Sequence, residues 1–221
     1  MRTIRVTGTG NVAVTPDLIQ TNITISGIKK KYKDAVEESA KNGALLKEAV
    51  SRASLDPKNL KTVKFNVSPY YERYQDKDNN WKQKFTGYQF THQFVIEFDN
   101  NNEILGKMMY ELANYGNDAR FSFSYTVKDI ETVKTQLLRN AVADSKRKAE
   151  IIAGAAKVGL KQIEHIDYSW GEVRMFSSPI SMPQYDFEES SMMRKSRSYD
   201  IDIEADDIRI NDTVTIVWSI D

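Results

Sequence analysis

Hydrophobic and polar residues alternate with a period of two along several stretches of the chain, the pattern of half-buried strands. Clear runs extend from about Leu18 to Ile28 and from Ala119 to Val127. Two more runs, at 63–67 and 88–98, flank a polar loop at 76–84 and predict a β-hairpin. Further strands are predicted at 163–170 and 213–220. We therefore expect largely antiparallel sheet.

Three stretches place apolar residues at helical spacing. The first runs from Asp34 to Ala53, and a short helix at 103–115 has Asn102 as its expected N-cap. A long helix should begin after Asp129 and end near Val158, where Gly159 follows. Its apolar face is mostly alanine towards the end, so we expect it to lie close to its packing partner.

Helices on one face of mostly antiparallel sheets define the α+β class, here with two long helices and one short one. The order strand, helix, strand, long loop, strand occurs in residues 18–98 and again in 119–220, which suggests a duplicated βαββ unit. We expect a single domain, 1–221, with two subdomains, 1–100 and 117–221, joined by the short helix.

The beginning of the chain permits two interpretations. Gly8, Gly10 and Ala13 fit the dinucleotide-binding pattern G-x-G-x-x-G/A, and Asp34 lies about 20 residues further on, where a ribose-binding acid is expected. That pattern requires a helix at the second glycine, whereas strand alternation follows here. The sequence favours a hairpin turn at Gly8-Thr9-Gly10, which would fold residues 4–7 back on 12–15.

Composition excludes several classes of function. The 221 residues include 31 basic and 31 acidic side chains, so no global field attracts nucleic acid. The chain has no cysteine, which excludes thiolate catalysis and disulfides. We find neither a transmembrane run nor a signal peptide after Met1. The sequence as it stands predicts a cytoplasmic protein, and an envelope, periplasmic or extracellular one if a leader has been removed.

Few residues suggest catalysis. His92 shares a strand face with Phe90 and Phe94 and is interpreted as a packed or hydrogen-bonded core histidine, while His165 should face solvent or a partner. Ser145 opens an S-x-x-K pattern but falls in the alanine stripe of the long helix, so we interpret it as a small packing residue. We expect no catalytic residue, no metal site and no cofactor.

The long connection at 171–200 carries the strongest functional hint, because it has no sustained period and is expected to be a flexible loop. Adaptable methionines and aromatic side chains suit partner surfaces. A loop merely attached to the body by its apolar residues is the alternative. The candidate partner-binding residues are Met175, Phe176, Met182, Tyr185, Phe187, Met192 and Met193.

Four stretches together resemble the SIMPL-domain family, which includes bacterial periplasmic immunogens, an oxidative-stress defence protein and kinase-interacting proteins. They are Val6-Thr7-Gly8-Thr9-Gly10 with Pro16-Asp17, Thr86-Gly87-Tyr88, Ala141 to Ala149 running on to Gly159, and Ile208 to Ile220. The chain departs from the family at Ala205-Asp206, where Pro-Gly is frequent, and at Ser145, where alanine is common. The resemblance implies an α+β fold, self-association, in one branch into ring- or channel-like assemblies, and no established catalytic residues.

Taken together, these observations predict a non-enzymatic protein, a homo-oligomer that also binds a protein partner, in stress response or cell-envelope biology. The alternative is an unrecognised hydrolase or small-molecule-binding enzyme that uses carboxylates or His92.

Overall fold

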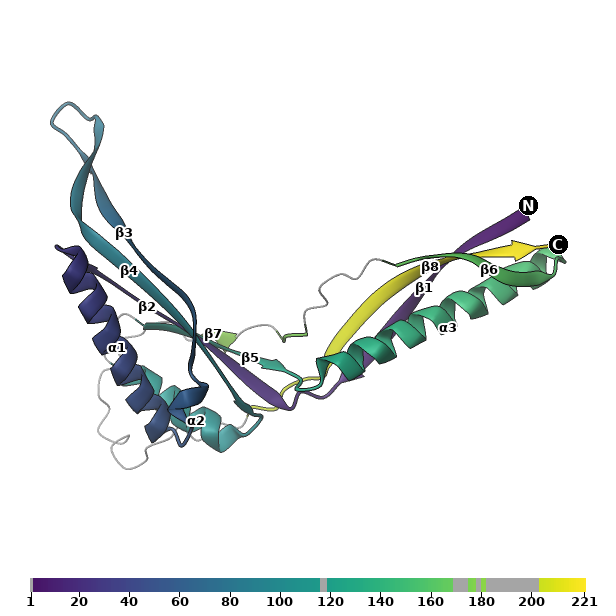
Figure 1. Cartoon of the computed structure of the whole chain (residues 1–221), viewed down its shortest axis with the longest axis horizontal. Helices are drawn as coiled ribbons and strands as arrows, with labels where there is room; N and C mark the ends of the chain where they lie inside the picture. Colours follow the sequence, from purple (N-terminus) through teal and green to yellow (C-terminus); the bar gives the residue numbers. More distant parts are fainter. Residues whose placement is uncertain (1, 116–118, 169–174, 178–179, 182–202) are drawn as a thin grey trace. The chain divides into compact units, whose positions relative to one another are not determined.

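The computed structural model describes residues 2–115, 119–168, 175–177, 180–181 and 203–221, which form two compact units (Figure 1). Unit 1 comprises 1–17, 126–177 and 205–221, and unit 2 comprises 18–125 and 178–204. Each has an antiparallel sheet, and the described part contains two long helices and one short α-helix. The predicted α+β class is therefore confirmed.

Unit 1 is a three-stranded sheet with one long helix along one face. Its strands stand in the order β1-β8-β6. The elements are β1 (Arg2–Val14), α3 (Ile130–Ala156), β6 (Leu160–Asp167) and β8 (Ile208–Ile220). β1 and β8 pair without interruption, from Arg2 opposite Ile220 to Val14 opposite Ile208. The core between sheet and helix is formed by Val6, Ala141, Ala149, Val214, Ile216 and Trp218.

The free edge of β1 is covered by polar side chains of α3. The side chain of Asn140 donates to the carbonyl of Asn11 (3.0 Å), and Asp144 accepts from the N–H of Thr9 (2.9 Å). Lys148 donates to the carbonyl of Thr7 (3.2 Å). Four residues of helix rise about 6 Å and two residues of strand about 6.7 Å, so the two periods match. The edge is thereby closed to another strand.

The two glycines at the beginning of the chain lie inside β1, and the predicted hairpin turn is wrong. Gly8 and Gly10 are both buried against α3. A Cβ on Gly8 would lie 2.0 Å from the carbonyl oxygen of Ala141, and one on Gly10 would lie 2.0 Å from that of Leu137. The glycines therefore permit close approach of helix and strand rather than a change of direction. The strand continues past Gly10 to Val14 and no helix opens there, so the dinucleotide interpretation fails as well.

The small residues of α3 complete this contact, as the sequence predicts. Ser145 is fully buried and its hydroxyl donates to the carbonyl of Val6 (3.2 Å), so it is a packing residue. Asp129 caps the helix by accepting from the N–H of Thr132 (2.9 Å). The helix ends at Ala156, with Lys157 in the left-handed conformation, two residues before the predicted end.

Unit 2 contains a five-stranded sheet, ordered β3-β4-β2-β5-β7, with α1 packed on β2 and β4 and α2 packed on α1. Its elements are β2 (Leu18–Lys29), α1 (Tyr32–Arg52), the 3-10 turn η1 (Pro57–Asn59), β3 (Lys61–Gln75), β4 (Trp81–Asp99), α2 (Asn102–Ala113), β5 (Ala119–Thr126) and β7 (Ile180–Ser181). The largest buried side chains include Ile19, Ile23, Ile25, Leu46, Phe90, Ile96, Leu105 and Met108. An ion pair between Arg52 and Glu111 (2.6 Å) links the helices.

The division of the chain differs from the predicted subdomains 1–100 and 117–221. β1 belongs with the C-terminal elements because it pairs with β8, while β5 joins the sheet of unit 2. The suggested βαββ duplication is therefore not found with its predicted strands. In both units a helix leads to an edge strand and then to a central strand, giving the orders β3-β4-β2 and β6-β8-β1. In unit 1 the remaining strand is β1, whereas the sequence predicts the strand at 119–127 in this role.

Candidate interaction surface

Beyond the end of β2, the hairpin of β3 and β4 continues as a two-stranded ribbon (Figure 1). The last residue of β2, Lys29, lies opposite Tyr88, and the outer pairs run from Tyr70 opposite Gly87 to Gln75 opposite Trp81. A Cβ on Gly87 would lie 2.3 Å from the carbonyl oxygen of Lys29, so this glycine admits the end of β2. Two-stranded ribbons are marginally stable in water, so this one needs support on a face.

One face of the ribbon is aromatic. Tyr71 lies opposite Phe85, and Trp81 follows four pairs further out on the same face. The register shift at Tyr70/Tyr71 brings Tyr88 onto this face as well, with its ring 5.4 Å from that of Phe85. Tyr71 and Phe85 meet edge to face at 5.6 Å. These edge-to-face contacts each contribute about 0.5–1.5 kcal/mol and hold the rings in place.

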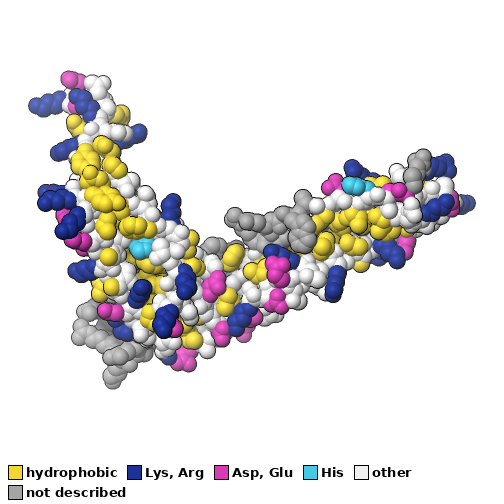
Figure 2. Space-filling model, viewed as in Figure 1, with side chains coloured by type: hydrophobic (Ala, Val, Ile, Leu, Met, Phe, Trp, Pro, Cys, Tyr) yellow, Lys and Arg dark blue, Asp and Glu magenta, His cyan; other side chains and the backbone are white. Residues whose placement is uncertain are grey.

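The aromatic face is open to solvent. Trp81 is 69% exposed, Tyr71 52% and Phe85 46%. Figure 2 shows hydrophobic side chains in a stripe along the hairpin, with Lys and Arg at its margins. We call the set Tyr71, Trp81, Phe85 and Tyr88 the aromatic ribbon face. In unit 2 the same face of the sheet is covered by α1 further along, and the helix begins only at Tyr32, whose ring lies 5.7 Å from that of Tyr88.

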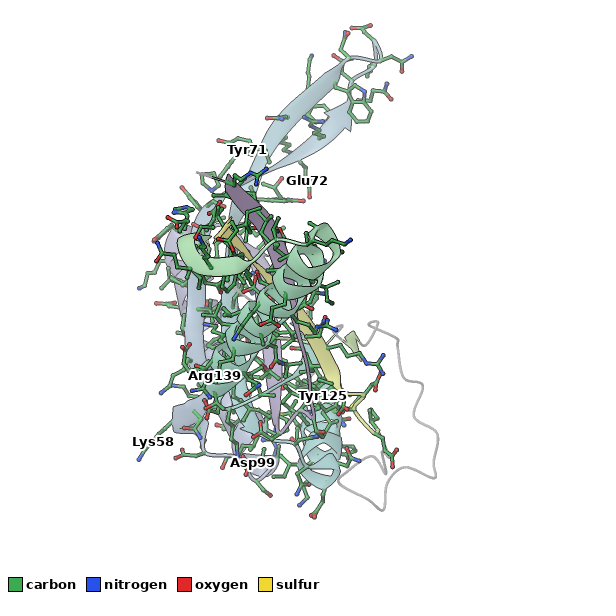
Figure 3. All side chains as sticks on the ribbon, turned by 90° about the vertical axis from the view of Figure 1, so that its right-hand side faces the viewer. Lys58, Tyr71, Glu72, Asp99, Tyr125 and Arg139 are labelled. Atoms are coloured by element: carbon green, nitrogen blue, oxygen red, sulfur yellow. The ribbon has the colours of Figure 1, made fainter. Side chains whose placement is uncertain are left out.

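The opposite face of the ribbon is polar. Successive residues of a strand point to opposite faces, so Glu72 lies on the other side from Tyr71 (Figure 3). Glu72 stands opposite Lys84, and Tyr74 stands opposite Lys82. On this face Tyr74 lies among charged residues, whereas the other face gathers Tyr71, Trp81, Phe85 and Tyr88, residue types that are enriched at protein interfaces. The ribbon is thus amphipathic.

The tip of the ribbon is ordered by one carboxylate. Asp76 accepts from the N–H groups of Asp78 (2.9 Å) and Asn80 (3.0 Å) and pairs with the ammonium of Lys82 (2.7 Å). Asn79 takes the left-handed conformation that the turn requires. The Lys82 ammonium, and after it the N–H of Asn80, lower the pKa of Asp76 below its usual value. A preformed tip reduces the entropy lost when the ribbon binds a partner.

The ribbon and the adjoining part of β3 are basic. Residues 61–88 carry six Lys and Arg against three Asp and Glu, a net charge of +3, in a chain whose formal charge is zero. The rest of the chain therefore carries −3. The negative remainder of one copy therefore attracts the positive ribbon region of another copy, which favours their encounter.

His92 lies deeper on the same sheet face and is held by two hydroxyls. Its Nδ1 is 3.0 Å from the Ser39 hydroxyl and its Nε2 is 3.0 Å from that of Thr62. The ring stacks on Phe94 at 3.9 Å, and burial lowers the pKa of His92 below its usual value. The predicted packing and hydrogen bonding of His92 are confirmed, but the residue is half-buried and not part of the core. His165 is exposed, as expected.

A metal site needs several ligand side chains that converge on one point. Within residues 2–115, 119–168, 175–177, 180–181 and 203–221, no three His, Asp or Glu side chains come together in this way. Ser39, the hydroxyl beside His92, is 2% exposed and lies on the buried side of α1. A substrate could not reach this hydroxyl without movement of the helix. Across the same ranges, no helix is long and apolar enough to span a membrane.

Only two of the seven candidate partner-binding residues are described. Met175 is buried in unit 1 beside Val127 and Val133, and its carbonyl accepts from the hydroxyl of Thr126 (2.7 Å). Met175 therefore packs inside its own unit and offers no surface to a partner, while Phe176 is exposed. The other five lie outside the described residues: Met182, Tyr185, Phe187, Met192 and Met193.

The aromatic ribbon face was missed by sequence reasoning, which predicts a polar loop at 76–84. The structure has a tight turn at 76–80, with strand on both sides. The signal that could have found it is the alternation of Trp81, Gln83 and Phe85 after the turn. With Gln83 between them, Trp81 and Phe85 fall on one face of a strand of period two, and Lys82 and Lys84 fall on the other.

The sequence matches the family model described as "SIMPL: Protein of unknown function (DUF541)" over residues 4–218. The chain is 26% identical over 222 residues to the "26 kDa periplasmic immunogenic protein" of Brucella melitensis biotype 1, with 98% of this chain and 84% of that protein covered. It is 25% identical, with the same coverage, to the protein of that name from Brucella abortus strain S19. Because the family model matches nearly the whole chain, the protein belongs to the SIMPL family.

Proposed function

We propose that this protein acts without catalysing a reaction, by assembling with further copies of itself through the aromatic ribbon face. The observation that carries the proposal is the exposure of Tyr71, Trp81 and Phe85 on a ribbon that no helix covers in the described part of unit 2. Neighbouring large aromatic side chains with this much exposure are rare on monomers and frequent at interfaces.

A second copy is the occupant that the charges favour. The ribbon region carries +3 and the remainder of the chain −3, so two copies attract one another where a ribbon meets the remainder. Residues 203–212, with Glu204, Asp206, Asp207 and Asp212 against Arg209, are one such acidic stretch. Further protein partners would bind by the same surface chemistry.

The test compares two faces of one ribbon. In the variant Tyr71→Ser with Phe85→Ser, the aromatic ribbon face loses its centre, and the dissociation constant of the assembly should rise about tenfold or more. Tyr74→Ser is the matched control, because Tyr74 is 46% exposed and lies on the opposite face. Sedimentation equilibrium gives the dissociation constants, and circular dichroism shows that each variant is folded.

An unchanged dissociation constant in the double variant would exclude this face as the interface. A loss of assembly in Tyr74→Ser equal to that in the double variant would show that the effect comes from the ribbon as a whole and not from its aromatic face.

The periplasm is the proposed place of action, because both relatives are named periplasmic proteins. We expect that expression of the complete natural reading frame releases the protein by osmotic shock, together with a periplasmic marker enzyme. Recovery of the protein only with a cytoplasmic marker would contradict this part of the proposal.

A further inference from the structure

The edges of the two sheets differ in how they are protected. The free edge of β1 is covered by Asn140, Asp144 and Lys148 of α3. Strand β3, at one end of the sheet of unit 2, contains Pro69 and two register shifts, which are common protections of edge strands. Strand β6, at the other end of the sheet of unit 1, is exposed in seven of its eight residues. β6 has two register shifts of its own, but it contains no proline, and no helix side chain is seen to bond its free edge in the described part of the chain. Among these described strands it is therefore the least protected edge.

The exposed residues of β6 include two isoleucines on one face. Ile163 lies opposite Trp218 and Ile166 opposite Ile216, so both are on the sheet face that packs on α3. They are nevertheless 42% and 51% exposed, because they lie at the margin of that core. The register shift between Ile163 and His165 brings residues three apart onto the same face. A strand added beside β6 would extend the core by one row.

The sequence of β6 is complementary to itself in the antiparallel direction. The central four residues are Ile163-Glu164-His165-Ile166. A two-fold axis between Glu164 and His165 places Ile163 opposite Ile166 of the second copy and Glu164 opposite His165 of the second copy. In this register apolar residues meet apolar residues, and the carboxylate meets the imidazole. Both strands have two residues between the paired isoleucines, so the register is kept although each strand has an extra residue there.

We propose that β6 pairs antiparallel with β6 of a second copy in this register, which joins the two three-stranded sheets into one of six strands. The inference rests on the proposed self-association and adds to it a second, isologous interface besides the aromatic ribbon face. Backbone hydrogen bonds supply the affinity, and the isoleucine pairs set the register.

Cysteine pairs test the register directly, since the chain has no cysteine of its own. Equimolar Ile163→Cys and Ile166→Cys proteins, mixed and gently oxidised, should give a disulfide-linked dimer, because Cα atoms of opposed residues lie about 4.5–5.5 Å apart and disulfides need about 4.4–6.8 Å. The control mixture is Lys161→Cys with Ile166→Cys, which is two residues out of register. We expect at least tenfold more heterodimer in the first mixture. Equal yields in the two mixtures would overturn the proposal.

A second variant separates this inference from the proposed function. Ile166→Lys places a charge in the new row and should lower the mass of the assembly measured by light scattering, with the circular dichroism spectrum unchanged. If Ile166→Lys keeps the mass of the unmodified protein while the variant Tyr71→Ser with Phe85→Ser loses it, the β6 pairing is wrong and the proposed function stands. If the unmodified protein is itself a monomer, both are wrong.

Discussion

Replacing Gly8 by alanine is expected to destabilise the protein by about 3 kcal/mol or more, at the upper end of the range for overpacked contacts. The added Cβ would lie 2.0 Å from the carbonyl oxygen of Ala141 and 2.4 Å from the backbone nitrogen of Ser145. These are backbone atoms in the middle of α3, so no side chain can rotate away, and β1 or the helix must shift. Gly10→Ala should behave alike, because its Cβ would lie 2.0 Å from the carbonyl oxygen of Leu137. Urea denaturation measures the loss.

The matched control lies in the same helix. Gly154 has no atom within 4 Å of the position that its Cβ would take. Gly154→Ala should therefore stabilise α3 by about 1 kcal/mol, the difference in helix propensity. The interpretation of the β1 glycines as close-approach residues would be wrong if Gly8→Ala and Gly10→Ala were as well tolerated as Gly154→Ala.

The second large effect concerns Asp144, which covers the edge of β1. The Lys148 ammonium, the N–H of Thr9 and the Arg147 guanidinium hold the pKa of this carboxyl well below its usual range. A carboxyl with a lowered folded-state pKa stabilises the fold above its unfolded pKa, and this stabilisation disappears as the pH falls towards the folded value. The unmodified protein should therefore lose stability as the pH falls below the usual value of 3.8.

Asp144→Asn tests this assignment, because asparagine keeps an oxygen for the Thr9 N–H but loses the charge. Its melting temperature should be below that of the unmodified protein at pH 7, and the difference should become smaller as the pH falls from about 4 to about 2. Glu150→Gln is the control on the same helix, since Glu150 is exposed and lies 4.0 Å from its partner Lys146. A difference between Asp144→Asn and the unmodified protein that stays constant from pH 7 to 2 would contradict the account.

Most helices and strands follow from local patterns, but the role of Gly8 and Gly10 does not. A G-x-G pattern shows that the backbone needs room or freedom, and it does not show which. The partner of these glycines, α3, lies more than 120 residues further along the chain. The alanine stripe of the long helix correctly predicts close packing, but only the structure places the glycines and the stripe against each other.

The packing of β1 on α3 brings together three of the stretches that resemble the SIMPL family. β1 contains the first, α3 the third, and β8 the last. Gly8 faces Ala141 and Ser145, and β8 completes the pairing of β1. The remaining stretch, Thr86-Gly87-Tyr88, marks the place where β2 ends and the ribbon continues alone. The resemblance of the chain to the family thus lies largely in positions that the packing within each unit requires.

The alternation of Trp81, Gln83 and Phe85 could have predicted the strand, but not the exposure of its aromatic face, because that exposure depends on the absence of cover. Trp81 and Phe85 alternate with charged and polar residues, as side chains of any half-buried strand do. The local sequence does not show that α1 begins too late to cover these two side chains, or that β2 ends at Lys29. The methionines and aromatics of the 171–200 segment gave a stronger compositional signal, and one of them, Met175, is a core residue.

The mass of the unmodified protein in solution, measured by light scattering during size-exclusion chromatography, tests the central claim most directly. Self-association predicts a mass that is a multiple of 25.3 kDa and that falls towards 25.3 kDa on dilution. A mass of 25.3 kDa at every concentration, up to the highest that stays soluble, would contradict the account.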